Sequence, residues 1–346
     1  MKKSIALLLL LALLTGCGEA QTFRANKTVY AMDTVMTLVA YGPNTPMSGD
    51  QSYSAPEYAL IQAEKELVRL DDLLSVSKES SDIYTLNRNH SAQISPETAA
   101  LLRSALDIAA MTDGDFDPTV SPLMELWGFR TQNYHIPSQA ELDKILPAVD
   151  FTQITLDGET ASLPANSGID LGGIAKGYAS ERALAVIAES GAESAIISLG
   201  GNVGALGLKP GGVRWNVAIQ DPANSDGLLA TLALGEADSM VYAITSGGYQ
   251  RYFRQDNTVY HHILDPKTGA PAETDLLSVT IVSSSGTLAD GLSTALFVKG
   301  FQDAVDFWRT HHEQFEMVLV TEDRLYATQG LSITSEQPIT TLEVAP

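Results

Sequence analysis

The chain has 346 residues, and its 42 Asp and Glu residues against 21 Lys and Arg residues give a formal net charge of −21. So acidic a chain repels polyphosphates, which argues against nucleic acid as a partner. The single cysteine excludes an intramolecular disulfide, a thiol nucleophile and a cysteine-rich zinc site. With 45% hydrophobic residues the chain can bury one large core or two smaller ones.

The amino terminus has the pattern of a bacterial lipoprotein signal. Two lysines precede an apolar run from Ile5 to Leu14, and Leu14-Thr15-Gly16-Cys17 completes a lipobox. The apolar run is too short to span a membrane. Gly18, rather than Asp, follows the cysteine, so we expect a lipid anchor in the cell envelope, facing the periplasm and favouring the outer membrane. The pattern predicts a signal peptide over residues 1–16, lipidation of Cys17 and a lipidated tether over residues 17–28.

In the first half of the chain, apolar residues recur at the spacing of strands or of amphipathic helices. Ser95 is a suitable cap for a helix whose first turn contains Pro96, and Gly114 follows the end of that helix. A proline-stiffened loop over 115–123 then leads to the segment 126–129, which we expect to be buried. The predicted elements are a strand over 29–41, helices over 58–74, 95–111 and 138–146, and half of a hairpin over 154–158.

The second half alternates between strand patterns and two helices. Its order of elements predicts an α+β fold with clustered strands and inserted helices. The predicted helices cover 176–190 and 287–299; the predicted strands cover 195–199, 203–208, 215–219, 228–234, 241–245 and 277–282, followed by a strand-rich tail.

The stretch from Asp170 to Tyr178 is rich in glycine and precedes a helix. Glycines let a backbone approach an anion, free N–H groups at the helix start face it, and Lys176 adds a positive charge. Gly177 follows the lysine where a P-loop needs Ser or Thr, and G-x-G-x-x-G is absent, so a Walker kinase and a Rossmann dehydrogenase are disfavoured. A phosphate loop and a tight connection without a ligand remain equal alternatives at this point.

Asp290, Ser293 and Thr294 lie near the start of a predicted helix. Residues three and four apart share a helix face, so one carboxylate and two hydroxyls converge there. Such an all-oxygen set suits Mg²⁺, which takes few protein ligands and keeps water and substrate phosphate in its shell. Taken alone, ordinary helix capping by Asp290 explains the segment better, and the metal interpretation needs a second oxygen-rich turn.

His262 stands at a strand end, immediately before a turn over Asp265–Gly269. A histidine held there can act as a general base, and His261 is expected to point to the opposite face. A single histidine in a strand is more often structural.

Taken in order, these motifs resemble the ApbE family of FAD:protein FMN transferases over nearly the whole mature chain. The resemblance implies a T-fold-like α+β domain over residues 29–340, with largely antiparallel sheets and inserted helices. The motifs that carry it are Ala31–Thr34, Ser81–Ile83, Leu86-Asn87, Phe116–Val120, Pro122-Leu123, Leu126–Phe129, Asp170–Tyr178, Leu199–Asn202, Ile219–Pro222, Thr245–Gly247, His262–Pro271 and Ala289–Leu296.

The resemblance also implies roles for particular residues. FAD would be the substrate, and the FMN phosphoryl group would pass to a threonine hydroxyl of a partner protein as AMP leaves. His262 would accept the hydroxyl proton. FAD would be held by Met32, Asp115, Phe116, Asp117, Asp170, Lys176 and Leu264, and Mg²⁺ by Asp290, Ser293, Thr294 and the carbonyl of Gly173.

The chain departs from the family pattern at a few positions. Ser77 occupies the place of an aromatic residue that can stack on flavin, and Tyr84 is a candidate substitute; Gly248 and Ser121 are further departures. A less covered flavin would let water compete with threonine. The alternatives are therefore an Mg²⁺-dependent FAD pyrophosphatase that yields FMN and AMP, or a flavin-binding lipoprotein without turnover. The expected acceptors are membrane redox pumps of the Nqr or Rnf kind or other secreted flavoproteins.

Overall fold

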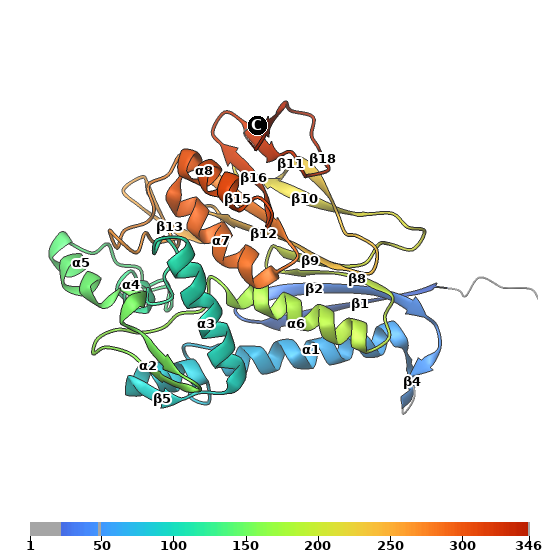
Figure 1. Cartoon of the computed structure of the whole chain (residues 1–346), viewed down its shortest axis with the longest axis horizontal. Helices are drawn as coiled ribbons and strands as arrows, with labels where there is room; N and C mark the ends of the chain where they lie inside the picture. The colour runs from blue at the N-terminus through green and yellow to red at the C-terminus, as the bar shows by residue number, and fades with distance from the viewer. Residues whose placement is uncertain (1–21, 48–49, 345–346) are drawn as a thin grey trace, which may run out of the picture.

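The computed structural model describes residues 22–47 and 50–344. A nine-stranded sheet in the order β1-β2-β8-β9-β12-β15-β16-β17-β19 forms the centre of the molecule (Figure 1). All its neighbouring strands pair antiparallel except β17 and β19. Its strands are β1 (Thr22–Ala31), β2 (Thr34–Pro43), β8 (Ser194–Leu199), β9 (Asn202–Leu206), β12 (Met240–Gly247), β15 (Leu276–Ser283), β16 (Glu316–Thr321), β17 (Leu325–Thr328) and β19 (Ile339–Leu342).

Helices cover one face of this sheet. In Figure 1 the long helices α1, α6 and α7 lie side by side, with α3 beside α7. Their apolar residues and those of the sheet form the largest core, which contains Leu67, Ile187 and Leu296. The helices are α1 (Ala55–Leu74), α2 (Asp82–Asn89), α3 (Pro96–Met111), α4 (Ser121–Leu126), α5 (Gln139–Ile145), α6 (Ala175–Glu189), α7 (Gly286–Lys299) and α8 (Phe301–His311).

A three-stranded sheet, β10-β11-β18, packs on the other face of the large sheet. Strand β10 (Trp215–Asp221) alternates buried and exposed residues, and Val217 and Ile219 join a second core with Ala243 of β12. Strand β11 (Asn224–Leu234) lies between β10 and β18 (Ile333–Thr334), so β10 forms one edge of this small sheet.

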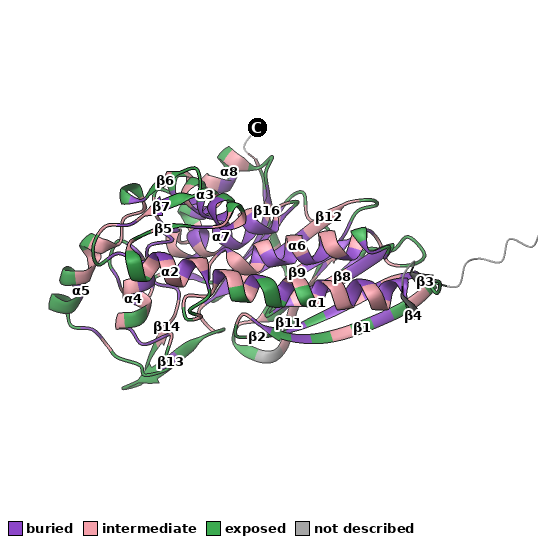
Figure 2. Ribbon diagram, turned by 90° about the horizontal axis from the view of Figure 1, so that it is seen from below, coloured by how far each residue is buried: buried purple, intermediate pink, exposed green. Residues whose placement is uncertain are grey.

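Most of the remaining elements lie at one end of the large sheet, whereas the short strands β3 (Pro46–Met47) and β4 (Asp50–Ser54) lie at the other end, beside the start of α1 (Figures 1 and 2). The hairpin of β13 (Tyr252–Gln255) and β14 (Thr258–His261) packs on a third core, which contains Trp127, Phe129 and Phe253. Figure 2 shows this hairpin projecting below α4, with exposed residues along it. The other short strands are β5 (Ser91–Gln93), β6 (Thr155–Asp157) and β7 (Thr160–Ser162).

The α+β prediction is confirmed, and so is most of the element order. The single strand predicted over 29–41 is wrong: β1 and β2 form a hairpin whose turn holds Met32 and Asp33 at φ of 50° and 56°. Non-glycine residues rarely adopt this left-handed conformation, so the turn has no glycine signal. Helix α8 was not predicted, because the tail after α7 was interpreted as strands only.

The amino-terminal predictions lie largely outside the described residues. The proposed signal peptide over 1–16 and Cys17 are not described. Of the predicted tether over 17–28, residues 22–28 belong to strand β1. In the described residues, no helix is both long and apolar enough to cross a membrane.

Candidate active site

The carboxylate of Asp290 is the most buried charged group of the predicted site. The residue lies in the first turns of α7 and is 3% exposed. Its Oδ2 accepts a 2.8 Å hydrogen bond from the backbone N–H of Gly177, and its Oδ1 accepts a 3.0 Å bond from Asn202 Nδ2. Within residues 22–47 and 50–344, no lysine or arginine forms an ion pair with it. A buried carboxylate without a cation is costly, so this position suits a bound positive charge.

Hydroxyl groups surround Asp290 on α7 and β12. Ser246 Oγ lies 2.8 Å from Ser293 Oγ and 3.3 Å from Thr294 Oγ1. Ser293 also donates to the backbone carbonyl of Asp290 at 2.9 Å. The sequence analysis did not assign Ser246 or Asn202 a role, although both stand in motifs that it singled out.

The glycine turn meets α7 at this point. A Cβ atom placed on Gly173 would lie 3.0 Å from the ring of Phe116 and 3.7 Å from Thr294 Oγ1. A Cβ atom on Gly177 would lie 2.1 Å from the carbonyl oxygen of Gly286, so only glycine lets α6 approach α7 this closely. The second oxygen-rich turn that the magnesium interpretation required therefore lies beside the hydroxyls of α7.

Asp170 stabilises the glycine turn from within. Its Oδ1 accepts a 2.8 Å hydrogen bond from the N–H of Gly172, and its Oδ2 forms a 3.0 Å ion pair with Arg130. One of the N–H groups expected to face an anion is therefore already bonded to a carboxylate. The half-buried Lys176 lies in the first turn of α6, with its Nζ 3.4 Å from the carbonyl of Gly172.

His262 follows β14 and lies near Lys176. Its Nδ1 is 3.1 Å from the carbonyl oxygen of Arg251, so the hydrogen bond requires that Nδ1 carry the proton, which leaves Nε2 as an acceptor. Although part of the residue is exposed, desolvation of the ring is the main cause that lowers its pKa to about 4, and the charge of Lys176 adds to it. A neutral imidazole with a free Nε2 can accept a proton.

The two neighbouring histidines face different surroundings, as alternation along a strand predicts. The ring of His262 lies 6.4 Å from Phe129, whereas that of His261 lies 5.5 Å from Phe297. Burial also lowers the pKa of His261.

The 115–117 loop is held mostly by the protein itself. Asp117 is buried and accepts hydrogen bonds from Thr119 N and Oγ1 at 2.7 and 2.6 Å and from Phe151 N at 3.0 Å. Burial is the largest influence on its pKa and raises it. Asp115 forms ion pairs with Lys267 at 2.7 Å and Lys299 at 2.5 Å. Contacts of these carboxylates with FAD remain predictions, and their observed contacts stabilise the loop.

The other predicted flavin contacts are not drawn together by hydrogen bonds in the described part of the chain. Met32 lies in the β1–β2 turn, and Leu264 is buried in the third core. Ser77 is exposed just beyond α1, with its Oγ 3.1 Å from that of Ser75. Within the described ranges, no group of three or more His, Cys, Asp and Glu side chains could hold a metal. A metal at Asp290 would therefore depend on hydroxyl and carbonyl ligands.

The chain is thus an α+β domain that places a buried carboxylate, a glycine-rich turn and a neutral histidine at one end of its sheet. This arrangement is that of an enzyme active site. The ApbE family model matches residues 32–319, so the chain belongs to the ApbE family. It is 33% identical to the FAD:protein FMN transferase of Treponema pallidum, over 75% of this chain and 76% of that protein. It is 31% identical to the corresponding protein of Salmonella typhimurium, over 86% of each.

Solved structures agree with the family assignment. The crystal structure of the ApbE protein of Thermotoga maritima superimposes with a TM-score of 0.77 at 30% identity, covering 91% of this chain and 97% of that one. The ApbE-type fold that the resemblance implied is therefore confirmed.

Proposed function

We propose that this chain is an FAD:protein FMN transferase that uses Mg²⁺ and attaches FMN to a threonine of an acceptor flavoprotein. Family membership supports flavin transfer. The observation that carries the metal-dependent mechanism is the buried Asp290 carboxylate, which has two hydrogen bonds and no cationic partner in the described residues.

The residues present fit Mg²⁺. Each carboxylate oxygen of Asp290 accepts one hydrogen bond and keeps a further lone pair, and Thr294 supplies a hydroxyl beside the Gly173 backbone. Hard oxygen donors of this kind are preferred by Mg²⁺. We therefore assign Asp290, Ser293, Thr294 and the Gly173 carbonyl to the metal and add Ser246, which orients both hydroxyls. When bound, Mg²⁺ would neutralise charge on the diphosphate and on the departing phosphate.

The other proposed site residues would assist the transfer of FMN to the acceptor threonine. The acceptor threonine Oγ forms a bond to the phosphorus of the FMN half, the bond from that phosphorus to the AMP oxygen breaks, and AMP leaves. The threonine proton passes to Nε2 of His262, whose Nδ1–H is held by the Arg251 carbonyl. Lys176 contributes positive charge near the same ring. Met32, Phe116, Asp170 and Leu264, together with the loop of Asp115 and Asp117, are proposed to surround FAD.

Hydrolysis of FAD to FMN and AMP is a second candidate activity. Ser77 is exposed and carries no aromatic ring to cover a flavin. Water would then reach the phosphorus more easily. A flavin carrier without turnover is the third possibility and is separated from both by the absence of AMP.

We also propose that the chain acts at the bacterial cell envelope, anchored by lipid at Cys17. The sequence pattern supports a lipoprotein signal over residues 1–16. Suitable acceptors would be extracytoplasmic flavoproteins, including subunits of Nqr or Rnf redox pumps.

A flavinylation assay tests the proposal. Purified protein is incubated with FAD, Mg²⁺ and candidate acceptor domains, and covalent flavin is detected by fluorescence of the denatured acceptor band, with AMP measured in parallel. A fluorescent band that requires Mg²⁺ supports the transferase. AMP with no band from any secreted flavoprotein of the same genome favours the pyrophosphatase, and the absence of both products contradicts both enzymatic proposals.

A further inference from the structure

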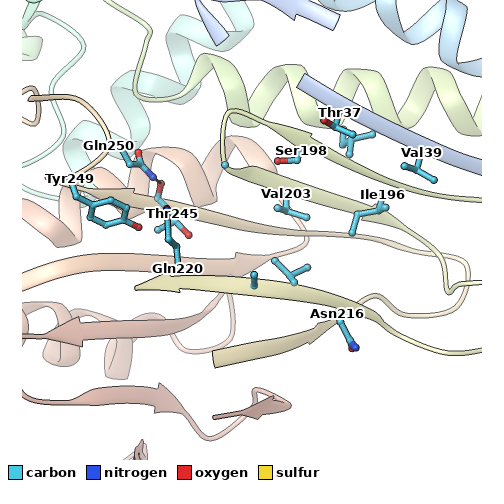
Figure 3. A pocket seen from close by; sticks show the side chains of 14 residues that line it. Thr37, Val39, Ile196, Ser198, Val203, Asn216, Gln220, Thr245, Tyr249 and Gln250 are labelled. Atoms are coloured by element: carbon cyan, nitrogen blue, oxygen red, sulfur yellow. Dashed lines mark hydrogen bonds between the residues drawn. The ribbon is translucent and has the colours of Figure 1, made fainter. Parts of the chain in front are cut away.

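A groove of about 360 Å³ runs along the sheet face opposite the helices (Figure 3). Thr37 and Val39 of β2 and Ile196 and Ser198 of β8 form its floor. Strand β10 forms its wall, where the exposed Ala218 faces the groove. The groove therefore lies between the two sheets, outside the residues assigned above to FAD and Mg²⁺.

The groove wall is an open sheet edge. Strand β10 ends the order β10-β11-β18, and among the described strands its only ladder partner is β11. Backbone N–H and C=O groups along such an edge can pair with an added strand. The wall therefore offers backbone recognition to an extended polypeptide, whatever the sequence of that polypeptide.

The lining is uncharged, although the chain carries a net charge of −21. All of its residues are apolar or neutral polar, and no lysine, arginine or histidine is present to receive a phosphate. The diphosphate of FAD thus finds no electrostatic partner here. A neutral strand with small and hydroxylic side chains matches both the short side chains of the floor and the absence of charge.

One end of the groove adjoins the candidate active site. Thr245 lines the groove, and the next residue along β12, Ser246, contacts Ser293 and Thr294 from the other side of the strand. Likewise Gly201 lines the groove, and its neighbour Asn202 donates to Asp290. A chain lying in the groove and continuing past these residues reaches the end of the sheet where the metal site lies.

We propose that this groove binds the acceptor flavoprotein, by adding an extended, uncharged segment of the acceptor to the free edge of β10. This inference rests on the proposed transferase function, because only a transferase needs a polypeptide substrate. The segment delivers its threonine hydroxyl beyond Thr245 and Gly201, toward the FMN phosphorus.

A blocking substitution tests the groove. Thr37 is an exposed floor residue, so Thr37→Arg fills the groove without burying the charge in the fold. Thr22→Arg is the matched control, because Thr22 is also exposed, lies on the same face of the adjacent strand β1, and is remote from the groove. With the acceptor found in the flavinylation assay, Thr37→Arg should raise the acceptor KM about tenfold or more. The FAD KM and the control variant should stay within about twofold of wild type.

A binding measurement provides a second readout. Hydrogen exchange of the intact protein, with and without a peptide spanning the acceptor threonine, should show new protection of the amides of β10 and little change in β16. An unchanged acceptor KM in Thr37→Arg, or a rise in the FAD KM instead, would overturn the groove assignment. If wild type modifies no acceptor at all, the proposed function fails first, so the two failures are distinguishable.

Discussion

Replacing Asp290 by Asn gives the sharpest test of the metal site. The substitution keeps the size of the side chain and removes its charge. It also replaces one carboxylate oxygen by an NH₂ group, which faces a donor, either Gly177 N or Asn202 Nδ2, and cannot accept its hydrogen bond. Loss of a hydrogen bond to a charged group costs about 1.5–3 kcal/mol. The substitution also removes the buried charge of Asp290, and this relieves a desolvation cost of several kcal/mol, which offsets the lost hydrogen bond. We therefore expect the metal-free variant to differ from wild type by less than about 2 kcal/mol in free energy of unfolding.

Addition of Mg²⁺ should raise the Tm of wild type but not that of Asp290→Asn. A ligand at 100 times its Kd stabilises the native state by about 2.7 kcal/mol. In a domain of this size 1 kcal/mol moves Tm by roughly 2 °C, so wild type should gain roughly 5 °C and Asp290→Asn nothing. AMP release from FAD should fall at least about 100-fold in the variant. Calorimetry with and without Mg²⁺ and an AMP assay measure both effects.

Asp303→Asn is the control for loss of one acidic charge. Asp303 lies in the first turn of the next helix, α8, and is exposed, whereas Asp290 is buried. This variant should keep both the Mg²⁺-dependent rise in Tm and the activity. Equal Mg²⁺ shifts in wild type and Asp290→Asn would refute the assignment of the carboxylate to the metal.

The remaining predictions concern the proton acceptor, the hydrogen bonds of Asp117, the packing of Gly177 and the flavin cover. The pKa of His262 is lowered to about 4 from 6.5, so between these pH values the unfolded state binds more protons than the folded state. The free energy of unfolding should therefore fall as the pH drops from 6.5 to 4. Urea titrations of His262→Asn should show a smaller fall over the same pH range. Asp117→Ala should lower the free energy of unfolding, measured in urea, by about 2–4 kcal/mol, because it leaves three hydrogen-bond donors without an acceptor. Gly177→Ala should cost more than about 3 kcal/mol in the same measurement, because its Cβ overlaps the Gly286 carbonyl. Ser77→Tyr should lower the ratio of free FMN to acceptor-bound FMN; an unchanged ratio argues against a role in flavin cover.

Local signals predicted the helices well where caps were explicit. Ser95 accepts a hydrogen bond from Thr98 N, and α3 runs from Pro96 to Met111, as the serine and proline indicated. The β1–β2 hairpin was missed because Met32 and Asp33 adopt a left-handed turn without glycine, so apolar alternation continues across the turn.

Residue spacing alone predicted which site residues lie together only where they share one short segment, and the more distant members of the site were named only through the family resemblance. Asp290 and Thr294 are close on one helix, and their spacing indicated a shared face. Ser246 lies 47 positions from Ser293 and Asn202 lies 88 positions from Asp290, and no local pattern encodes such contacts. Strand pairing and helix packing bring these residues together, so they follow from tertiary structure and not from spacing.

The glycine turn shows how both kinds of information combine. Its composition left a phosphate loop and a plain connection equally open, and Asp170 occupies one of the N–H groups that a phosphate would need. Gly177 instead donates its N–H to Asp290, while its missing side chain lets the backbones of α6 and α7 touch. The N–H of Gly177 therefore helps to orient the carboxylate of α7, the helix to which we assign Mg²⁺. In the proposed mechanism a bound cation, rather than the loop itself, is the principal partner of the diphosphate, so the Asp290 experiment tests the metal site and this role of the cation together.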